Sequence, residues 1–393
     1  MAYTLTREAL LLDLHAAFQC AKHKKTQKPY VRVFERDLER NLNRLADDLM
    51  DRSYKPEPSS CFIIQRPKKR EVFAAQFRDR VVHHLYYNYA HQLFERTFIQ
   101  DTYSCIPERG THYGVDRLKQ HIRRESHGFQ RECYVMSLDI RGYFMHIDRQ
   151  ILAEIAVGSL QRMGHHRVSA QGRQRWEDVV DIPFLEWLTR EIIMLDPKTH
   201  CQRVGSETEW VGLDPEKSLF HTREGCGLPI GNLTSQLFSN VYLNEFDQFM
   251  KRTLGCKHYG RYVDDAYVVS ADKRWLLSLV PHIRQFLKER LHLDLHMGKL
   301  RIQEVHQGAE FLGAYVKPRT TYISNAAVRR LVASVDNIDT GNRERVLRSV
   351  NSFLGVLSHY DSYNIRCGLF LRPEFLRHGT FNRDMTTFTL SRW

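Results

Sequence analysis

The sequence has no long apolar run, and its first residues do not have the pattern of a signal peptide. No apolar stretch approaches the ~20 residues that a transmembrane helix needs. The first residues, Met1 to Leu5, do not show the charged and then apolar layout of a signal peptide. We therefore expect a cytoplasmic protein with no membrane partner.

The cysteine and histidine spacings of disulfide-rich or zinc-binding proteins are also missing. The eight cysteines are scattered without a C-x-x-C pair, and neither His83-His84 nor His165-His166 has a further ligand at zinc spacing. Internal repeats, low-complexity stretches and Pro/Gly-rich linkers are absent too. We expect reduced, buried cysteines and lobes that pack together.

Positive charge is in excess. The 58 Lys and Arg residues outnumber the 46 Asp and Glu residues, which gives a formal net charge of +12. Such an excess suits a polyanionic partner such as nucleic acid, although charge for solubility alone is an equal alternative. From Arg319 onward the chain carries arginine but no lysine, which predicts a basic C-terminal lobe.

The spacing of apolar residues predicts a mixture of helices and strands. Apolar residues at helical spacing favour helices in the first fifty residues, over 81–98 and over 237–249, while stripes at 328–335 and 346–357 predict two C-terminal helices. The runs 61–65 and 71–74, separated by Pro67 to Arg70, predict a hairpin with a basic tip. A central strand is expected at 134–138, and a second hairpin at 262–269.

Three aspartates fall at the ends of these expected strands. Asp139 follows the strand 134–138, and Asp264 and Asp265 occupy the turn of the second hairpin. Taken singly, each is commonly an ordinary turn or loop residue. Together they could hold the two divalent ions, about 3.5–4 Å apart, that polymerases use for phosphoryl transfer, because Mg²⁺ requires oxygen ligands.

The order of the motifs around these aspartates resembles that of bacterial reverse transcriptases. Tyr262-Val263-Asp264-Asp265 matches their Tyr-x-Asp-Asp box, and residues 138–144 resemble the upstream aspartate box of the enzymes related to group II introns. The segment 227–236 lies between them, as that family requires. Gly298-Lys299 looks like the lysine box and residues 310–313 like the primer-gripping hairpin, so the match runs in order over roughly residues 60 to 360.

This resemblance implies an α+β right-hand polymerase with fingers, a palm with an antiparallel sheet backed by the 237–249 helix, and a helical thumb. The implied domains are an N-terminal helical extension (1–58), fingers (59–133), palm (134–316, with a fingers-type insertion at about 157–222), and thumb with C-terminal tail (317–393). The implied activity is RNA-directed DNA synthesis from template RNA, a primer strand and dNTPs. No endonuclease, ribonuclease H or maturase segment is expected after the thumb.

The resemblance also implies a role for each matched residue. Asp139 and Asp264 would ligate two Mg²⁺ ions (Mn²⁺ is possible), Asp265 would support them, and Ile140 is a further ligand position. Phe144 falls where an aromatic ring excludes a 2′-hydroxyl, and Arg70 is the first choice for the triphosphate. The dNTP-binding set is Lys68, Arg70, Phe144, Ile230, Gly231, Gln236 and Lys299, and the nucleic-acid-binding set is Tyr262, Leu312, Gly313, Arg329, Arg330, Arg343, Arg345 and Arg348.

Ordinary alternatives stand beside these roles. Phe144 could be a core residue, the basic tip a solvated turn, and Lys299 a solvent-facing lysine. At the level of the whole chain, the alternative is a basic RNA-binding scaffold that keeps the fold without catalysis. The retained carboxylates count against it, because acidic groups that repel one another are costly to maintain.

The subclass is indicated by the segment around Ile230. Where most related enzymes have Gln-Gly-x-x-x-Ser-Pro, this chain has Ile230-Gly231-x-x-x-Ser235-Gln236. This looks like the reverse transcriptases of diversity-generating retroelements, as do 78–84, 210–220 and 351–355. Such enzymes misincorporate at adenines and work with a small basic accessory variability protein. The alternative is an antiviral-defence or other prophage enzyme with a different template and primer.

Overall fold

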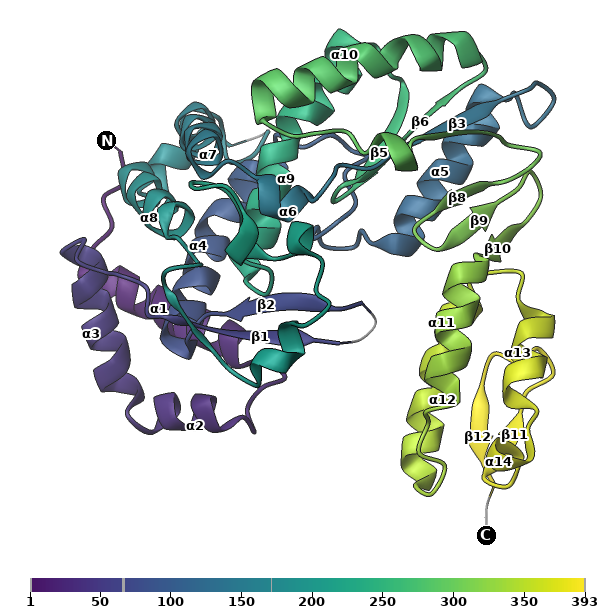
Figure 1. Ribbon diagram of the computed structural model, residues 1–393. Coiled ribbons are helices and arrows are strands. Elements are labelled where there is room, and N and C mark those ends of the chain that lie inside the picture. Colours follow the sequence, from purple (N-terminus) through teal and green to yellow (C-terminus); the bar gives the residue numbers. More distant parts are fainter. Residues whose placement is uncertain (1, 66–67, 171, 392–393) are drawn as a thin grey trace. The chain divides into compact units, whose positions relative to one another are not determined.

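The computed structural model describes residues 2–65, 68–170 and 172–391 (Figure 1). The chain divides into two compact units, each built from separated segments. The first unit comprises Met1–Ile106, Ile140–Gly255 and Pro281–His296, and the second comprises Pro107–Asp139, Cys256–Val280 and Met297–Trp393. Each contains helices and strands, so the expected mixture of both is confirmed. No helix in the described part of the chain has the length and hydropathy to cross a membrane.

Helices open the first unit, as the apolar spacing predicts. These are α1 (Arg7–Lys22), α2 (Pro29–Arg36) and α3 (Leu38–Met50). Thr6 caps α1 by accepting a hydrogen bond from the backbone N–H of Ala9. Both α1 and α3 present buried leucines, and α1 packs along α4 (Phe77–Glu95). The long helix expected at 81–98 is therefore present and begins four residues earlier.

A three-stranded sheet adjoins these helices in the first unit. β1 (Ser59–Ile64) and β2 (Arg70–Ala74) form the expected antiparallel hairpin, with Phe62 opposite Val72. Pro67, in the expected tip, lies outside the described residues. β4 (Cys201–Arg203) adds to β1 in parallel. The hairpin is thereby joined to a segment more than 100 residues further along the chain.

The remaining long helices of the first unit pack on α4 and on one another. The short α6 (Tyr143–His146) is followed by α7 (Arg149–Gly164) and α8 (Ile182–Met194), which pack together. α9 (Leu233–Gln248) contacts α4 and α7 and continues into a π-helical turn over Phe249–Thr253. The helix expected at 237–249 is confirmed, and its role as the backing of the palm sheet stays a prediction. Short 3₁₀ turns lie at Trp176–Asp178, Glu207–Trp210, Pro215–Lys217 and Leu219–His221.

A four-stranded antiparallel sheet is the centre of the second unit. Its order is β5 (His258–Tyr262), β6 (Asp265–Ser270), β3 (Tyr134–Leu138) and β7 (Arg301–Glu304). Met136 of the central strand lies between Val268 and Ile302. α5 (Thr111–Glu125) packs on β5 and β6. α10 (Lys273–Leu291) follows β6 and ends in the first unit, and a 3₁₀ turn occupies Met297–Lys299.

The C-terminal part of the second unit begins with a small sheet. β8 (Ala309–Phe311), β9 (Ala314–Val316) and β10 (Thr321–Ile323) form an antiparallel meander. α11 (Asn325–Val335) and α12 (Arg343–Leu357) follow, and their buried residues confirm the two predicted stripes. The last elements are α13 (Tyr363–Phe370), α14 (Pro373–Leu376), β11 (Gly379–Phe381) and β12 (Phe388–Leu390).

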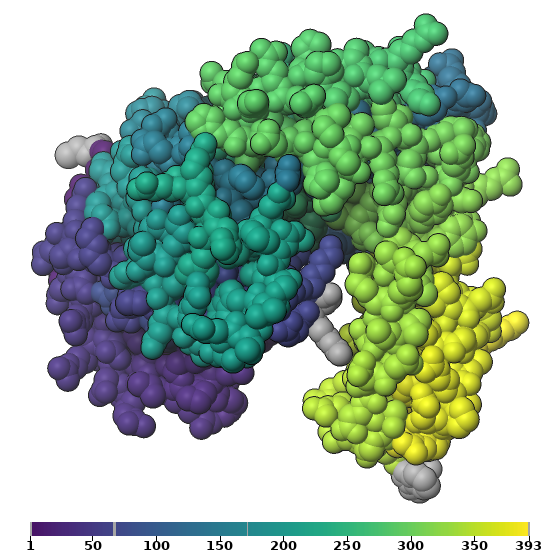
Figure 2. Space-filling view, viewed as in Figure 1, coloured from purple at the N-terminus to yellow at the C-terminus, as the bar shows by residue number. Residues whose placement is uncertain are grey.

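These last elements share one core with α11 and α12. Leu331, Val350, Leu354, Phe370 and Phe388 are among its buried members. In the space-filling view the C-terminal segment, in yellow, covers one side of the yellow-green α11 and α12 (Figure 2). The apolar stripes of both helices therefore face inward. Arg329, Arg330, Arg345 and Arg348 are exposed, whereas Arg343 is half-buried.

Candidate active site

The three aspartates lie at one end of the four-stranded sheet, all in the second unit. Leu138 pairs with Ala266 at the last register position of β3 and β6. Continuing this antiparallel register by one residue brings the backbone of Asp139 to the level of Asp265. Val263 and Asp264 form the two-residue turn between β5 and β6, which Tyr262 and Asp265 close. Residues more than 120 positions apart in sequence are thus collected on neighbouring strand ends.

The turn that carries Asp264 has an unusual backbone. Val263 adopts φ +54°, a left-handed value that is rare for a β-branched residue and is typical of strained functional turns. The guanidinium of Arg261, which is fully buried, donates a hydrogen bond to the carbonyl oxygen of Val263 at 2.9 Å. Sequence reasoning missed this support. The sequence feature that could have indicated it is a charged residue inside a predicted strand, between neighbours that are apolar or glycine.

A cation already accompanies one of the three carboxylates. The ammonium of Lys299 lies 3.0 and 2.9 Å from the two carboxylate oxygens of Asp139. The Asp139 side chain is 14% exposed, whereas that of Lys299 is 57% exposed. Lys299, assigned to the dNTP from the resemblance, is therefore an ion-pair partner of the first aspartate in this structure.

The three aspartate side chains at this end of the sheet are carboxylates, and carboxylate oxygens are the type of ligand that a hard divalent cation prefers. Within residues 2–65, 68–170 and 172–391, however, no group of three or more His, Cys, Asp and Glu side chains is arranged to hold a metal ion. Ile140, the further ligand position, is buried in the first unit and forms a β-bridge with Leu295. The metal assignment stays a prediction.

Two of the three cationic side chains at the tip of the β1–β2 hairpin are exposed to solvent. Lys68 and Arg70 are exposed, while the Lys69 ammonium donates to the carbonyl oxygen of Val211 at 2.6 Å. Lys68 and Arg70 are thus accessible to an anionic ligand. The dNTP-binding role of both stays a prediction.

Glu71, next to Arg70, is a buried anchor that sequence reasoning missed. Its side chain accepts hydrogen bonds from Trp210 Nε1 (3.0 Å), Ser218 Oγ (3.0 Å) and the backbone N–H of Leu219 (2.8 Å). A buried carboxylate is stable when several donors surround it. Successive side chains of β2 point to opposite faces, so Glu71 lies on the same buried face as Phe73. An acidic residue at such a position is the sequence feature that could have indicated this anchor.

Phe144 and Ile230 pack against the same apolar cluster in the first unit. Its buried members are Cys61, Phe73, Met145 and Leu219. Both Phe144 and Ile230 are half-buried, so each has one side in the cluster and part of its surface exposed. Burial raises the pKa of the Cys61 thiol to about 12, which keeps it protonated and apolar. Core packing and an exposed contact face are both present at these two residues.

Gly231 is fixed by its close approach to β2. Its φ is +126°, and an added Cβ would lie 2.9 Å from the carbonyl oxygen of Phe73 and from Val72 Cγ1. The N–H of Phe73 also donates to the carbonyl oxygen of Ile230 at 2.8 Å. Gln236 is exposed in the first turn of α9. The 230–236 segment is therefore attached to the hairpin at its start and accessible at its end.

The hairpin expected around residues 310–313 is present as β8 and β9. Leu312 (φ +51°) and Gly313 (φ +81°) make its turn, and Gly313 accepts a hydrogen bond from the N–H of Ser324. Tyr262 is half-buried at the end of β5. The contacts of these residues with nucleic acid stay predictions.

The five C-terminal arginines fall into two groups. Arg343 donates to the carbonyl oxygen of Ser391, and Arg345 and Arg348 lie 3.1 and 3.9 Å from the carboxylates of Asp339 and Glu344. Arg329 and Arg330 are exposed on α11, and no side chain in the described part of the protein pairs with either. These two are the most available to a phosphate backbone.

Comparisons with known proteins give limited matches. No family model matches the chain. Protein YkfC of Escherichia coli (strain K12) is 24% identical over 316 residues, which cover 72% of each chain.

Among solved structures, telomerase from Candida albicans with a TWJ fragment of telomeric RNA has a TM-score of 0.47 at 13% identity, over 90% of this chain and 60% of that one. Apo telomerase from Candida tropicalis has a TM-score of 0.46 at 10% identity, over 83% and 64%. The chain thus spans less than two thirds of the length of these telomerases. At TM-scores below 0.5, the likeness carries no argument about activity.

Proposed function

We propose that this chain is an RNA-directed DNA polymerase that copies template RNA into cDNA. The observation that carries the proposal is the placement of Asp139 and the Asp264-Asp265 turn on neighbouring strand ends of one sheet. In this proposal Asp139, Asp264 and Asp265 would hold Mg²⁺ or Mn²⁺, which would supply positive charge at the attacking 3′-hydroxyl and the leaving pyrophosphate.

The chain's own residues would bind and orient the substrates. Arg70 and Lys68 are exposed cations that would bind the triphosphate, with arginine in a bidentate geometry that lysine does not offer. Phe144 presents part of its ring outside the cluster that fixes it, and would exclude a 2′-hydroxyl. Lys299 would pair with Asp139 before substrate binds and then neutralise the pyrophosphate.

In the same proposal, the elements take the parts of a polymerase right hand. The β1–β2–β4 sheet would be part of the fingers, the β5–β6–β3–β7 sheet the palm, and α11 with α12 the core of the thumb. This division rests on the order of the sequence motifs along these elements. Template RNA, primer and dNTPs are the ligands that it requires.

The test is primer extension on a defined RNA template. Purified protein should incorporate dNTPs in the order that the template dictates, and Asp264→Ala/Asp265→Ala should abolish extension. Removing charges that repel one another should leave the free energy of unfolding unchanged or slightly raised, and RNA binding should persist. Extension by the double variant within tenfold of wild type would refute the catalytic assignment.

The runner-up from another class is a non-catalytic RNA-binding scaffold. It shares the exposed arginines and the net positive charge with the polymerase. The same experiment separates them, because a scaffold would bind the RNA with unchanged affinity in both proteins and extend no primer in either.

We further propose that synthesis is error-prone opposite template adenines, as in a diversity-generating retroelement with a basic accessory protein. The support is Ile230. Its backbone carbonyl oxygen accepts a hydrogen bond from the N–H of Phe73, and its side chain packs on apolar residues. An isoleucine side chain has no polar group that could lose its hydrogen-bond partner when a wrong base pair forms. It therefore adds no free-energy penalty against that wrong pair. Ile230→Gln should therefore lower the error ratio at adenines by roughly five- to thirtyfold, equivalent to about 1–2 kcal/mol.

Sequencing of products copied from one RNA by both proteins decides this subclass. If Ile230 serves only to pack against the cluster, Gln should reduce stability and extension at every template base alike. Wild-type errors spread evenly over the four bases would leave a general or antiviral-defence reverse transcriptase. Sequencing the RNA that copurifies separates those cases, since a retroelement enzyme should carry a transcript that repeats the 3′ end of a nearby gene.

A further inference from the structure

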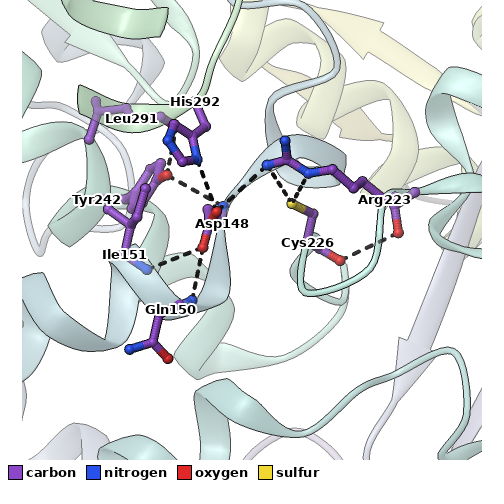
Figure 3. Close-up of polar contacts among 9 residues, drawn as sticks. Asp148, Gln150, Ile151, Arg223, Cys226, Tyr242, Leu291 and His292 are labelled. Carbon is purple, nitrogen blue, oxygen red and sulfur yellow. Dashed lines mark hydrogen bonds and ion pairs between the residues drawn. The ribbon is translucent and has the colours of Figure 1, made fainter. Parts of the chain in front are cut away.

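One carboxylate in the first unit connects three separate segments of the chain. Asp148 Oδ1 accepts hydrogen bonds from the backbone N–H groups of Gln150 (3.0 Å) and Ile151 (3.2 Å), and so caps α7 (Figure 3). Its Oδ2 lies 3.1 Å from His292 Nδ1, just after α10, and 3.6 Å from Arg223 Nη2. Asp148 thus joins the start of α7 to the end of α10 and to the segment that precedes Gly227.

The backbone beside this carboxylate ties two of the predicted substrate-binding segments together. Residues 144–149 and 225–228 run antiparallel, with Asp148 opposite Cys226. The Arg223 Nε and Nη2 atoms lie 3.3 and 3.2 Å from the sulfur of Cys226 on the same segment. Across the pairing, Arg223 Nη2 lies 3.6 Å from Asp148 Oδ2. The bonds of the pairing are Arg149 N to Gly225 O (2.9 Å), Gly227 N to Ile147 O (2.8 Å) and Leu228 N to Phe144 O (2.8 Å).

The pairing runs directly into the two residues predicted to select the nucleotide. Phe144 is itself the acceptor of the last bond, and Ile230 follows Leu228 by two residues. Both pack against one apolar cluster. The position of Phe144 relative to Ile230 therefore depends on the pairing that the Asp148 carboxylate and Arg223 hold from its other end.

We propose that Asp148, with Arg223 and His292, is a positioning residue for nucleotide selection. The inference rests on the proposed polymerase function and deepens it. Asp148 acts through the paired segments and touches no substrate group. Because small misplacements of substrate-orienting groups are costly, its loss should weaken dNTP binding and selection more than the chemical step.

The primary test is Asp148→Asn, studied by single-nucleotide incorporation on a primed RNA template. Asparagine caps a helix as well as aspartate does, so α7 keeps its cap while the charge facing Arg223 and His292 is removed. We expect KM for the correct dNTP to rise about tenfold, the preference for dNTP over rNTP to fall severalfold, and kcat to stay within about threefold.

Two further variants separate positioning from general stability. Asp181→Asn is the matched control, because Asp181 caps α8 through the N–H of Phe184 and its other carboxylate oxygen accepts from the N–H of Leu5. It should leave KM and sugar preference unchanged. Arg223→Gln should reproduce the Asp148→Asn effect, and the double variant should lose less than the product of the two single effects.

Each possible result of these experiments either supports or contradicts the positioning role of Asp148. Unchanged KM and sugar preference in Asp148→Asn and Arg223→Gln, or a loss confined to kcat, would overturn the positioning role while wild-type extension upheld the polymerase. Multiplicative effects in the double variant would separate Arg223 from Asp148 and overturn the shared node. If Asp148→Asn failed to fold, Arg223→Gln alone would decide, because the Arg223 side chain is 64% exposed. A wild-type protein that incorporated no nucleotide would refute the proposed function itself.

Discussion

The ion pair between Lys299 and Asp139 gives the clearest prediction for a single side chain. An ammonium within 3.0 Å of both oxygens competes with any divalent cation for the same carboxylate. Lys299→Met should therefore lower the Mg²⁺ concentration for half-maximal extension by up to about fivefold, since a partly exposed pair contributes ~0.2–1 kcal/mol. It should also lower the maximal rate by about tenfold or more, because the pyrophosphate would lose its cation.

The measurement is the rate of dNTP incorporation as a function of Mg²⁺ concentration. Lys288→Met, which removes an exposed lysine from α10, is the control and should leave both values unchanged. A Lys299 variant with wild-type rate and Mg²⁺ dependence would return Lys299 to the role of a solvent-facing lysine.

Single residues were predictable from sequence where a local pattern surrounds them. The three aspartates stand at strand ends whose apolar runs are visible in the sequence, and the structure brings those strand ends together. The partners of Glu71 and Arg261 were not predictable, because alternation shows which face a side chain takes and not which group compensates its charge. The contact of Lys299 with Asp139 spans 160 positions, and no local pattern encodes it.

Gly231 gives a prediction for the contact between the 230–236 segment and β2. Gly231→Ala would place a Cβ 2.9 Å from the Phe73 carbonyl oxygen, with φ at +126°. We expect a loss of about 2 kcal/mol or more in the free energy of unfolding, from backbone strain and overpacking combined. Extension should fall with it, because the segment would move away from the hairpin.

Urea unfolding compared with Gly212→Ala separates these two causes. Gly212 also has a left-handed φ, +78°, but an added Cβ there meets no described atom within 4 Å. It should cost only the backbone strain, about 1 kcal/mol. Equal losses in the two variants would mean that the approach to β2 adds nothing.

Elements with a strong apolar period were predicted well. The strand over 134–138 has the expected bounds, and both hairpins and the two C-terminal helices are present. β4, β11 and β12 were missed, since each has three residues and too short a run to show a period. The parallel pairing of β4 with β1 also depends on a distant partner.

For the whole molecule, the exposed arginines of α11 predict the salt dependence of nucleic-acid binding. Arg329 and Arg330 are free to contact phosphates, whereas Arg345 and Arg348 lie beside acidic side chains. Replacing Arg329 and Arg330 by Gln should flatten the plot of log affinity against log salt by roughly 0.7–0.9 for each phosphate that is no longer neutralised. Arg345→Gln should flatten it less, because its charge is partly neutralised by Asp339.

Fluorescence anisotropy with labelled RNA over a range of salt concentrations measures these slopes. Identical slopes for wild type and the Arg329→Gln/Arg330→Gln variant would assign this face to solvent or to a protein partner.

At the scale of the whole molecule, each compact unit is assembled from three separated segments of the chain. Apolar period and turn residues describe consecutive stretches of chain and cannot show such interleaving.

Template-directed DNA synthesis is tested most directly by incorporation of one labelled dNTP opposite each base of a primed RNA. In the presence of Mg²⁺, wild type should add the complementary nucleotide in preference to the other three, with the lowest selectivity opposite template adenine. Asp139→Asn should slow addition ~100-fold or more, with circular dichroism and unfolding unchanged. Asp272 follows the other end of β6 and caps α10, because its Oδ1 accepts a hydrogen bond from the N–H of Trp275. Asp272→Asn should retain the wild-type rate. Addition that ignored the template base, or an Asp139 variant within tenfold of wild type, would contradict the polymerase assignment.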